Sequence, residues 1–271
     1  MLKPDVINEI QDLRYLNWAR VRHSSGTAGS YLKAYDKFRG IKRYYKLSCY
    51  DSVNGITGHE SVNEIIVDRL LTILGIEHLH YQLIHAVISI DSQDHETYLC
   101  VSEDFKQPGD SKIALDDYYE LEREKGESIL SFCRRMGWAD YIYRMLVVDY
   151  LILNRDRHGA NIEILRDSQR GITHPAPLFD HGLSLVYSCR TDEEVGAFDP
   201  MDDKPVQSYV GSRSALDNLS LIPEREKPVL RRLEERDRAV LFAGLEEVIP
   251  QIYRDKIWEI IWNRWRYYED I

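Results

Sequence analysis

The spacing of apolar residues changes along the chain, and this change limits the folds that it can adopt. The first part holds short runs rich in Tyr, Val and Ile, separated by polar turns, which is typical of β-strands. These runs cover residues 31–36, 43–50, 81–90 and 97–105. One segment among them, residues 59–76, has helical spacing instead, and Gly75 is placed to end a helix.

From residue 115 onward the apolar spacing is mostly helical. The predicted helical segments are 115–125, 127–136, 138–153, 223–235, 237–249 and 253–268. A β-rich first part with one helix, followed by a mostly helical second part, predicts an α+β fold of two lobes. We place the lobes at residues 1–105 and 106–271, with the hinge region at residues 106–110.

Composition excludes several classes of protein. The 271 residues include 44% hydrophobic ones, enough to bury a full core. A net charge of -10 repels phosphate backbones, so we expect no direct binding of nucleic acid. No apolar run approaches the roughly 18 residues of a membrane span, and the amino terminus lacks the apolar centre of a signal peptide.

The cysteines and histidines give no metal signature. The four cysteines are scattered without a Cys-x-x-Cys pair, and we expect reduced thiols in a cytoplasmic protein. The nine histidines are too dispersed to predict a metal site from their spacing.

A dense group of polar side chains lies between two apolar runs in the segment LILNRDRHGANIEIL, residues 151–165. A solvated turn normally carries Gly, Pro, Ser and one or two charges, whereas this one carries a carboxylate, two guanidiniums, an imidazole and carboxamides. A second motif, Asp180-His181-Gly182, follows a short predicted hairpin. Both patterns are more typical of a functional site than of a simple turn.

Transfer of a phosphoryl group from ATP fits these residues. The reaction needs positioning and charge neutralisation more than covalent help from the protein. Asn161 and Asp180 offer the hard oxygen ligands that Mg²⁺ prefers. Asp156, five residues before Asn161, is the candidate base that orients the attacking hydroxyl and takes its proton.

The first part of the chain supplies further candidates. Residues 24–30, SSGTAGS, are small, so their backbone N–H groups could approach phosphates closely. Lys46 lies in a predicted strand, and Glu64 lies on the predicted helix, where the two could form an ion pair that holds the lysine against the α- and β-phosphates.

In these motifs the sequence resembles the HipA-like serine/threonine kinases, including the smaller bacterial members of the CtkA type. The resemblance rests on residues 24–34, 62–76, 154–161 and 177–185. It implies a bilobal kinase fold with ATP in the cleft, Mg²⁺ on Asn161 and Asp180, and Asp156 as the base. It also implies that Lys46 binds phosphate with Glu64 as its partner.

The resemblance assigns further residues to the nucleotide. Ser102, Glu103 and Asp104 would form the hinge whose backbone groups meet adenine, and His158 is counted with the cofactor-binding residues. The phosphate loop would comprise Gly26, Thr27, Ala28, Gly29 and Ser30.

The resemblance also implies autophosphorylation within the phosphate loop. Ser24, Ser25, Thr27 and Ser30 offer hydroxyls, with Ser30 the first choice and Ser25 the second. A phosphate there would repel the phosphates of ATP and limit activity.

Two departures from ordinary protein kinases stand out. His181 occupies the place of a phenylalanine, so an apolar in-and-out switch is not expected. Residues 186–210 form a long polar stretch in the position of an activation or substrate loop, and its acidic residues favour a basic partner.

Three functions remain open at this point. The first is a protein kinase that acts on Ser or Thr of a protein substrate, with a cognate regulatory protein as a possible partner. The second is a kinase for a small molecule or a lipid head group, because the same cleft chemistry accepts any hydroxyl. The third is a nucleotide-binding or scaffolding module without turnover.

Overall fold

The structure is a computed structural model that describes residues 5–20, 31–107, 109–167 and 170–271. A six-stranded sheet forms its first part, with the strand order β1-β7-β8-β4-β3-β2. Neighbouring strands run antiparallel, except that β1 and β7 are parallel. The strands are β1 (Val6–Asp12), β2 (Ala19–Arg20), β3 (Leu32–Phe38), β4 (Ile41–Lys46), β7 (Tyr81–Ile90) and β8 (Gln93–Glu103). A small hairpin of β5 (Tyr50–Asp51) and β6 (Gly55–Ile56) follows β4.

The four strands predicted from short runs rich in Tyr, Val and Ile are present as β3, β4, β7 and β8. The residues of β7 alternate between buried and half-buried positions along much of its length, as expected for a strand with one face on a core. Strand β1 was not predicted. It pairs with β7 alone at the edge of the sheet and is half-buried or exposed throughout, so its sequence shows no clear alternation.

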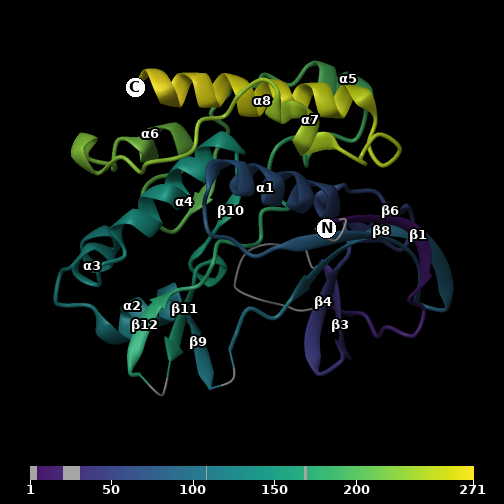
Figure 1. Ribbon diagram of the computed structural model, residues 1–271, viewed down its shortest axis with the longest axis horizontal. Helices are drawn as coiled ribbons and strands as arrows, with labels where there is room; N and C mark the ends of the chain where they lie inside the picture. The colour runs from purple at the N-terminus through teal and green to yellow at the C-terminus, as the bar shows by residue number, and fades with distance from the viewer. Residues whose placement is uncertain (1–4, 21–30, 108, 168–169) are drawn as a thin grey trace.

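Helix α1 (Glu60–Leu74) is the predicted first helix, and it is enclosed by protein along its whole length. Every residue in it except Thr72 is buried. It lies between the sheet and the two helices α7 (Asp237–Phe242) and α8 (Gln251–Asp270), as Figure 1 shows. Gly75 ends the helix as predicted, at φ 72°, a left-handed conformation that glycine adopts without strain.

The second part is mostly helical. Its remaining helices are α2 (Leu115–Glu122), α3 (Ile129–Arg135), α4 (Ala139–Leu151), α5 (Asp192–Gly196) and α6 (Ala215–Leu219), with 3₁₀ turns at Gly159–Asn161 and Glu224–Glu226. Its antiparallel sheet has the order β12-β11-β9. These strands are β9 (Asp110–Ala114), β11 (Glu163–Asp167) and β12 (Ile172–Pro175), while β10 (Asp156–Arg157) pairs in parallel with β13 (Gln207–Ser208).

Two predicted helices are largely wrong. Residues 223–235 form only the short 3₁₀ turn and then an extended segment. Pro228 has no N–H to donate, and the Arg231 N–H instead binds the Leu74 carbonyl oxygen at the end of α1. The helix predicted over residues 237–249 stops at Phe242, just before Gly244 at φ 72°.

The apolar core has two parts, one on each face of the large sheet. The larger cluster joins α1 to the helical second part, and the smaller one fills the opposite face of the sheet, where Ala86, Ile88 and Leu99 are fully buried. The fold is therefore α+β, with α1 shared by the sheet and the helices. Within the residues that the structure describes, no helix is long and apolar enough to cross a membrane.

Candidate active site

Three segments that are distant in sequence meet at Lys46, the last residue of β4. Its Nζ atom lies 3.1 Å from Oε1 of Glu64 on α1 and 2.9 Å from Oδ1 of Asp180. Glu64 is buried, so this ion pair is well shielded from water. The structure thus brings together Lys46, Glu64 and Asp180, three residues that the sequence analysis placed in one site.

Lys46 and Asp180 stabilise each other's charged form. Burial alone would lower the pKa of Lys46, but the carboxylates of Asp180 and Glu64 outweigh it and raise that pKa well above its ordinary value. Burial alone would raise the pKa of Asp180, but the lysines at positions 46 and 33 hold it well below its usual range. Lys46 is therefore a cation and Asp180 an anion at neutral pH.

Helix α1 holds the Asp180-His181-Gly182 segment in place. Oε2 of Glu64 accepts the backbone N–H of His181 at 2.9 Å. The Asn63 side chain donates to the carbonyl oxygens of Gly182 and Ser184, both at 3.0 Å. The segment therefore takes its position from the buried face of a helix and not from its own turn.

Close packing requires the glycine of this motif. A Cβ atom at Gly182 would lie 3.2 Å from Cβ and 3.3 Å from the carbonyl oxygen of Glu60. His181 is buried beside it, and burial together with the charge of Arg157 lowers its pKa well below the ordinary value. His181 is therefore a neutral side chain in the core.

The backbone of Asp180 is left-handed at φ 61°. Aspartate tolerates this conformation better than most residues, and such positions are common where a side chain must be aimed. The Asp180 N–H donates to the hydroxyl of Tyr81 at 3.2 Å, which supports the unusual backbone. Tyr81, at the start of β7, was not among the predicted site residues.

Part of the polar segment at residues 154–161 is structural. Arg157 is buried, and its guanidinium binds the carboxylate of Asp149 on α4. Its Nη1 donates to the carbonyl oxygens of Asn161 and Phe179, both at 3.1 Å. One guanidinium therefore ties the loop that carries Asn161 to the segment that precedes Asp180.

Asp156 and Asn161 are joined through the backbone. Nδ2 of Asn161 donates to the carbonyl oxygen of Asp156 at 2.8 Å, which fixes the orientation of the carboxamide. Oδ1 of Asp156 is buried and has no hydrogen-bond partner among the residues that the structure describes; Nε2 of His158 lies 3.7 Å away. Burial raises the pKa of Asp156, and Asp180 raises it further while His158 opposes both.

The residues predicted to hold Mg²⁺ suit that ion. Asp180 offers a carboxylate that stays ionised, and Asn161 offers a carboxamide oxygen in a side chain already oriented by its NH₂ group. In such sites Mg²⁺ usually binds few protein oxygens, and phosphate oxygens and water complete its coordination.

Lys33 is a site residue that the sequence did not reveal. It lies on β3 directly opposite Lys46 on β4, and its Nζ is 3.9 Å from Oδ2 of Asp180. Although Asp180 favours the charged form, burial and the neighbouring Lys46 together lower the pKa of Lys33. The only signal in the sequence was a lysine in a predicted strand, because strand register cannot be read from this chain.

The predicted hinge lies at the end of β8. Ser102 is buried and paired within the sheet, and Glu103 is the last residue of the strand. The Asp104 N–H is donated to the carbonyl oxygen of Lys42 at 3.0 Å, so this amide is already bonded. An adenine ring at the hinge would therefore use other backbone groups of the stretch.

The predicted phosphate loop lies outside the described residues. This applies to Gly26, Thr27, Ala28, Gly29 and Ser30, and to the candidate phosphorylation sites Ser24 and Ser25.

Residues 186–210, the predicted activation or substrate loop, are folded against α8. Helix α5 begins with a capping box of Thr191 and Glu194. The buried Arg264 of α8 donates to the carbonyl oxygens of Pro200 at 2.8 Å and Asp202 at 2.7 Å. The segment is therefore a packed part of the helical half.

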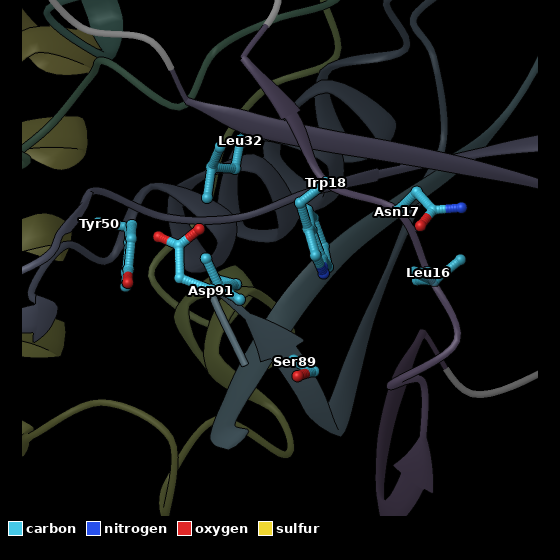
Figure 2. A pocket seen from close by; sticks show the side chains of 8 residues that line it. Leu16, Asn17, Trp18, Leu32, Tyr50, Ser89 and Asp91 are labelled. Atoms are coloured by element: carbon cyan, nitrogen blue, oxygen red, sulfur yellow. The ribbon is translucent and has the colours of Figure 1, made fainter. Parts of the chain in front are cut away.

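A separate hollow of about 300 Å³ lies on the face of the large sheet that α1 does not cover. Figure 2 shows Trp18, Tyr50 and Asp91 among its lining side chains. It contains none of the predicted site residues, so we do not assign it to the active site.

Comparison with known proteins supports the fold. No family model matches the sequence, and no curated protein matches it. Among solved structures, the proinflammatory kinase CtkA of Helicobacter pylori matches with a TM-score of 0.59 over 94% of this chain and 93% of that chain, at 14% identity. HipA of Shewanella oneidensis MR-1, solved with HipB and operator DNA, matches at 14% identity with a TM-score of 0.43, over 89% of this chain and 55% of that one. The match to CtkA confirms the expected kinase-like α+β fold.

Proposed function

We propose that this protein is a kinase that transfers the γ-phosphoryl group of ATP, with Mg²⁺, to a serine or threonine hydroxyl of a protein. The observation that carries the proposal is the position of Lys46 between Glu64 and Asp180, at 3.1 Å and 2.9 Å. Kinases use such a lysine for the phosphates, a helix glutamate to hold it and an aspartate for the metal. The kinase-like fold supports the same conclusion.

Two lysines would neutralise the nucleotide phosphates. Lys46 would bind the α- and β-phosphates while Glu64 fixes its ammonium group. Lys33 lies beside it on the neighbouring strand and would supply a second positive charge at the same edge of the sheet. A bound phosphate would replace part of the attraction that Asp180 exerts on the two ammonium groups. The lysines would therefore move little when ATP binds.

The residues for the metal and the base would come from the second part of the chain. When bound, Mg²⁺ would neutralise charge on the β- and γ-phosphates. Asn161 and Asp180 would hold it. The carboxylate of Asp156 would accept the proton of the attacking hydroxyl, while the hydroxyl oxygen bonds to the γ-phosphorus and ADP leaves.

We infer the class of the phosphate acceptor from the charge of the folded segment at residues 186–210. Helix α5 places Asp192, Glu193 and Glu194 in its first turn, and all three are exposed. This acidic surface favours a protein segment rich in Lys or Arg over an anionic lipid head group. We therefore propose a basic protein region that carries the Ser or Thr acceptor.

Intact mass after incubation with Mg-ATP tests the proposal. We expect phosphate on the chain itself or on a basic Ser-containing protein, and none when Asp156→Ala replaces the wild type. Asp140→Ala, an exposed aspartate on α4, is the matched control and should behave as wild type. Absence of transfer to any protein, with ATP turnover intact, would favour a small-molecule acceptor; absence of turnover would favour a binding module.

Peptide mapping of the modified chain locates the phosphate. We propose autophosphorylation at Ser30 or Ser25, where the added charge would weaken ATP binding. Phosphate found only within residues 186–210 would move the regulation to that segment.

A further inference from the structure

A second group of ionisable side chains lies one helical turn beyond Glu64 on α1 and includes neither Lys46 nor Glu64. Asp68 of α1 meets His78 and His80, which lie in the connection from α1 to β7. We propose that Asp68, His78 and His80 bind a transition metal ion of the zinc class. This proposal does not depend on the kinase function.

The three side chains converge on one point. Oδ1 of Asp68 lies 2.6 Å from Nε2 of His78 and 3.0 Å from Nδ1 of His80. The three ligand atoms all lie within 4.8 Å of one another. Asp68 and His78 are buried, whereas the His80 side chain is 75% exposed, so the group opens to solvent on one side.

The hydrogen bonds around the group match the outer contacts of metal sites. Nδ1 of His78 is 2.7 Å from the carbonyl oxygen of Ile76, so this nitrogen carries the proton. Histidines that bind a metal usually donate their other N–H to a carbonyl or carboxylate in this way. The second oxygen of Asp68 accepts the Tyr81 N–H at 2.9 Å, which fixes the carboxylate.

Two imidazole nitrogens meet one carboxylate oxygen in this group. Nε2 of His78 lies 2.6 Å from Oδ1 of Asp68, and Nδ1 of His80 lies 3.0 Å from the same oxygen. A cation bound at this point would be held by both nitrogens and by the oxygen.

The donor set selects the kind of ion. Two imidazoles and one carboxylate suit Zn²⁺ and its neighbours, which bind nitrogen and oxygen at about 2.0–2.2 Å. Donor atoms arranged tetrahedrally at that distance from the ion lie about 3.3 Å apart. Oδ1 of Asp68 and Nε2 of His78, which are 2.6 Å apart, would therefore need to separate by less than 1 Å. The exposed side next to His80 leaves the fourth position to water.

The ion would fasten the end of α1 to the start of β7. Asp68 follows Glu64 by one helical turn, and Tyr81, whose N–H binds Asp68, accepts the Asp180 N–H with its hydroxyl. The metal would therefore stabilise the framework behind the active site. The spacing of residues in the sequence did not reveal this group, because its carboxylate lies on α1 and not next to the two histidines.

Titration of the metal-free full chain with Co²⁺ tests the proposal, since tetrahedral Co²⁺ bound by histidine absorbs strongly in the visible range. Excess Mg²⁺ in the buffer occupies oxygen-only sites. We expect one equivalent of Co²⁺ to bind with these bands, and Zn²⁺ to displace it. His80→Ala should weaken binding at least tenfold, and His174→Ala, an exposed histidine on β12, should not.

The His80 side chain is exposed, so its replacement should leave the fold intact, which circular dichroism checks. In the same proteins, Zn²⁺ should raise the melting temperature of wild type and His174→Ala but not of His80→Ala. Absence of the Co²⁺ bands in the wild type, or equal affinity in the two variants, would show that the group is only a hydrogen-bonded cluster.

Discussion

Asp156 is a carboxylate with a buried oxygen that has no hydrogen-bond partner among the described side chains. A buried oxygen of this kind is costly unless something binds to it, and unsatisfied groups tend to occur at functional positions. Its pKa is raised by burial, which moves the carboxylate towards the range in which a base accepts a proton efficiently. These properties favour Asp156 over its neighbours as the base.

Replacement of this residue should separate chemistry from binding. Asp156→Ala should lower phosphoryl transfer by about 10²–10⁴-fold, while ATP affinity stays within a few-fold because the proposed base would act on the acceptor hydroxyl and not on the nucleotide. Single-turnover transfer and calorimetric titration with ATP measure the two effects. A wild-type rate in this variant would contradict our assignment of the base.

The acid side of the pH–rate profile should report the same carboxylate. Because the pKa of Asp156 is raised above the ordinary value of 3.8, protonation should reduce the rate at a higher pH than for a normal aspartate. His158 opposes this shift, so His158→Ala should move the decline to still higher pH. A decline that moves to lower pH in His158→Ala would contradict this arrangement.

Metal binding should depend on Asp180. The Asp180→Asn variant lacks the carboxylate charge that attracts a divalent ion, so it should lose most of the rise in melting temperature that Mg-ATP gives to the wild type. Thermal shift with ATP alone serves as the baseline. An unchanged Mg²⁺ effect would place the metal elsewhere.

At the scale of elements, the segment at residues 186–210 depends on one side chain of α8. Arg264 is buried and donates to two backbone carbonyl groups of this segment, and it also lies over the ring of Tyr150, 4.9 Å from its centroid. Burial lowers its pKa, although Tyr150 and nearby carboxylates oppose this shift. The position of the segment therefore rests on interactions from a distant part of the chain.

Removal of this guanidinium should loosen the segment. Arg264→Met keeps much of the volume but leaves two carbonyl groups without their donor, at about 1–3 kcal/mol for each buried group that stays unpaired. We expect limited proteolysis to cut within residues 199–203 in this variant. Arg266→Met, an exposed arginine on the same helix, is the matched control and should resist cleavage as the wild type does.

At the scale of the whole molecule, α1 makes the sheet and the helices one cooperative unit. Its apolar residues belong to the cluster that also contains the cores of α4, α7 and α8. Arg69 links Asp5, ahead of β1, to the carbonyl oxygen of Leu241 on α7. On the face of the sheet that packs against α1, the sheet and the helices therefore share one apolar core.

Calorimetry should accordingly show a single unfolding transition. Leu70→Ala removes a fully buried side chain of α1 and should destabilise the protein by about 2–5 kcal/mol without splitting that transition. Equality of the calorimetric and van't Hoff enthalpies is the measurement. Two resolved transitions in the wild type or in this variant would contradict a shared core.

Local patterns in the sequence predicted those features that depend on few residues. A run rich in Val and Ile predicted β7, helical spacing and Gly75 predicted α1, and the kinase-like order of motifs placed Lys46 with Glu64. Features set by distant contacts were missed. The pairing register that puts Lys33 opposite Lys46 is one example.

The helix predicted at residues 223–235 shows the opposite error. Its residues have helical spacing, but Pro228 and a hydrogen bond to the end of α1 favour an extended segment. Tertiary contacts overrode the local preference there, and no single-sequence pattern reports them.

The enclosure of α1 also has a consequence for genetics. A helix in which every residue except Thr72 is buried rejects bulky substitutions along nearly its entire length, whatever those residues do for activity. A saturation mutagenesis screen that selects for function should therefore score α1 as severely as the loop around Asp156, although Glu64 is the α1 residue that binds Lys46. Intolerance in such a screen would mark this helix as framework, and only measurements on folded, purified variants would separate it from the catalytic residues.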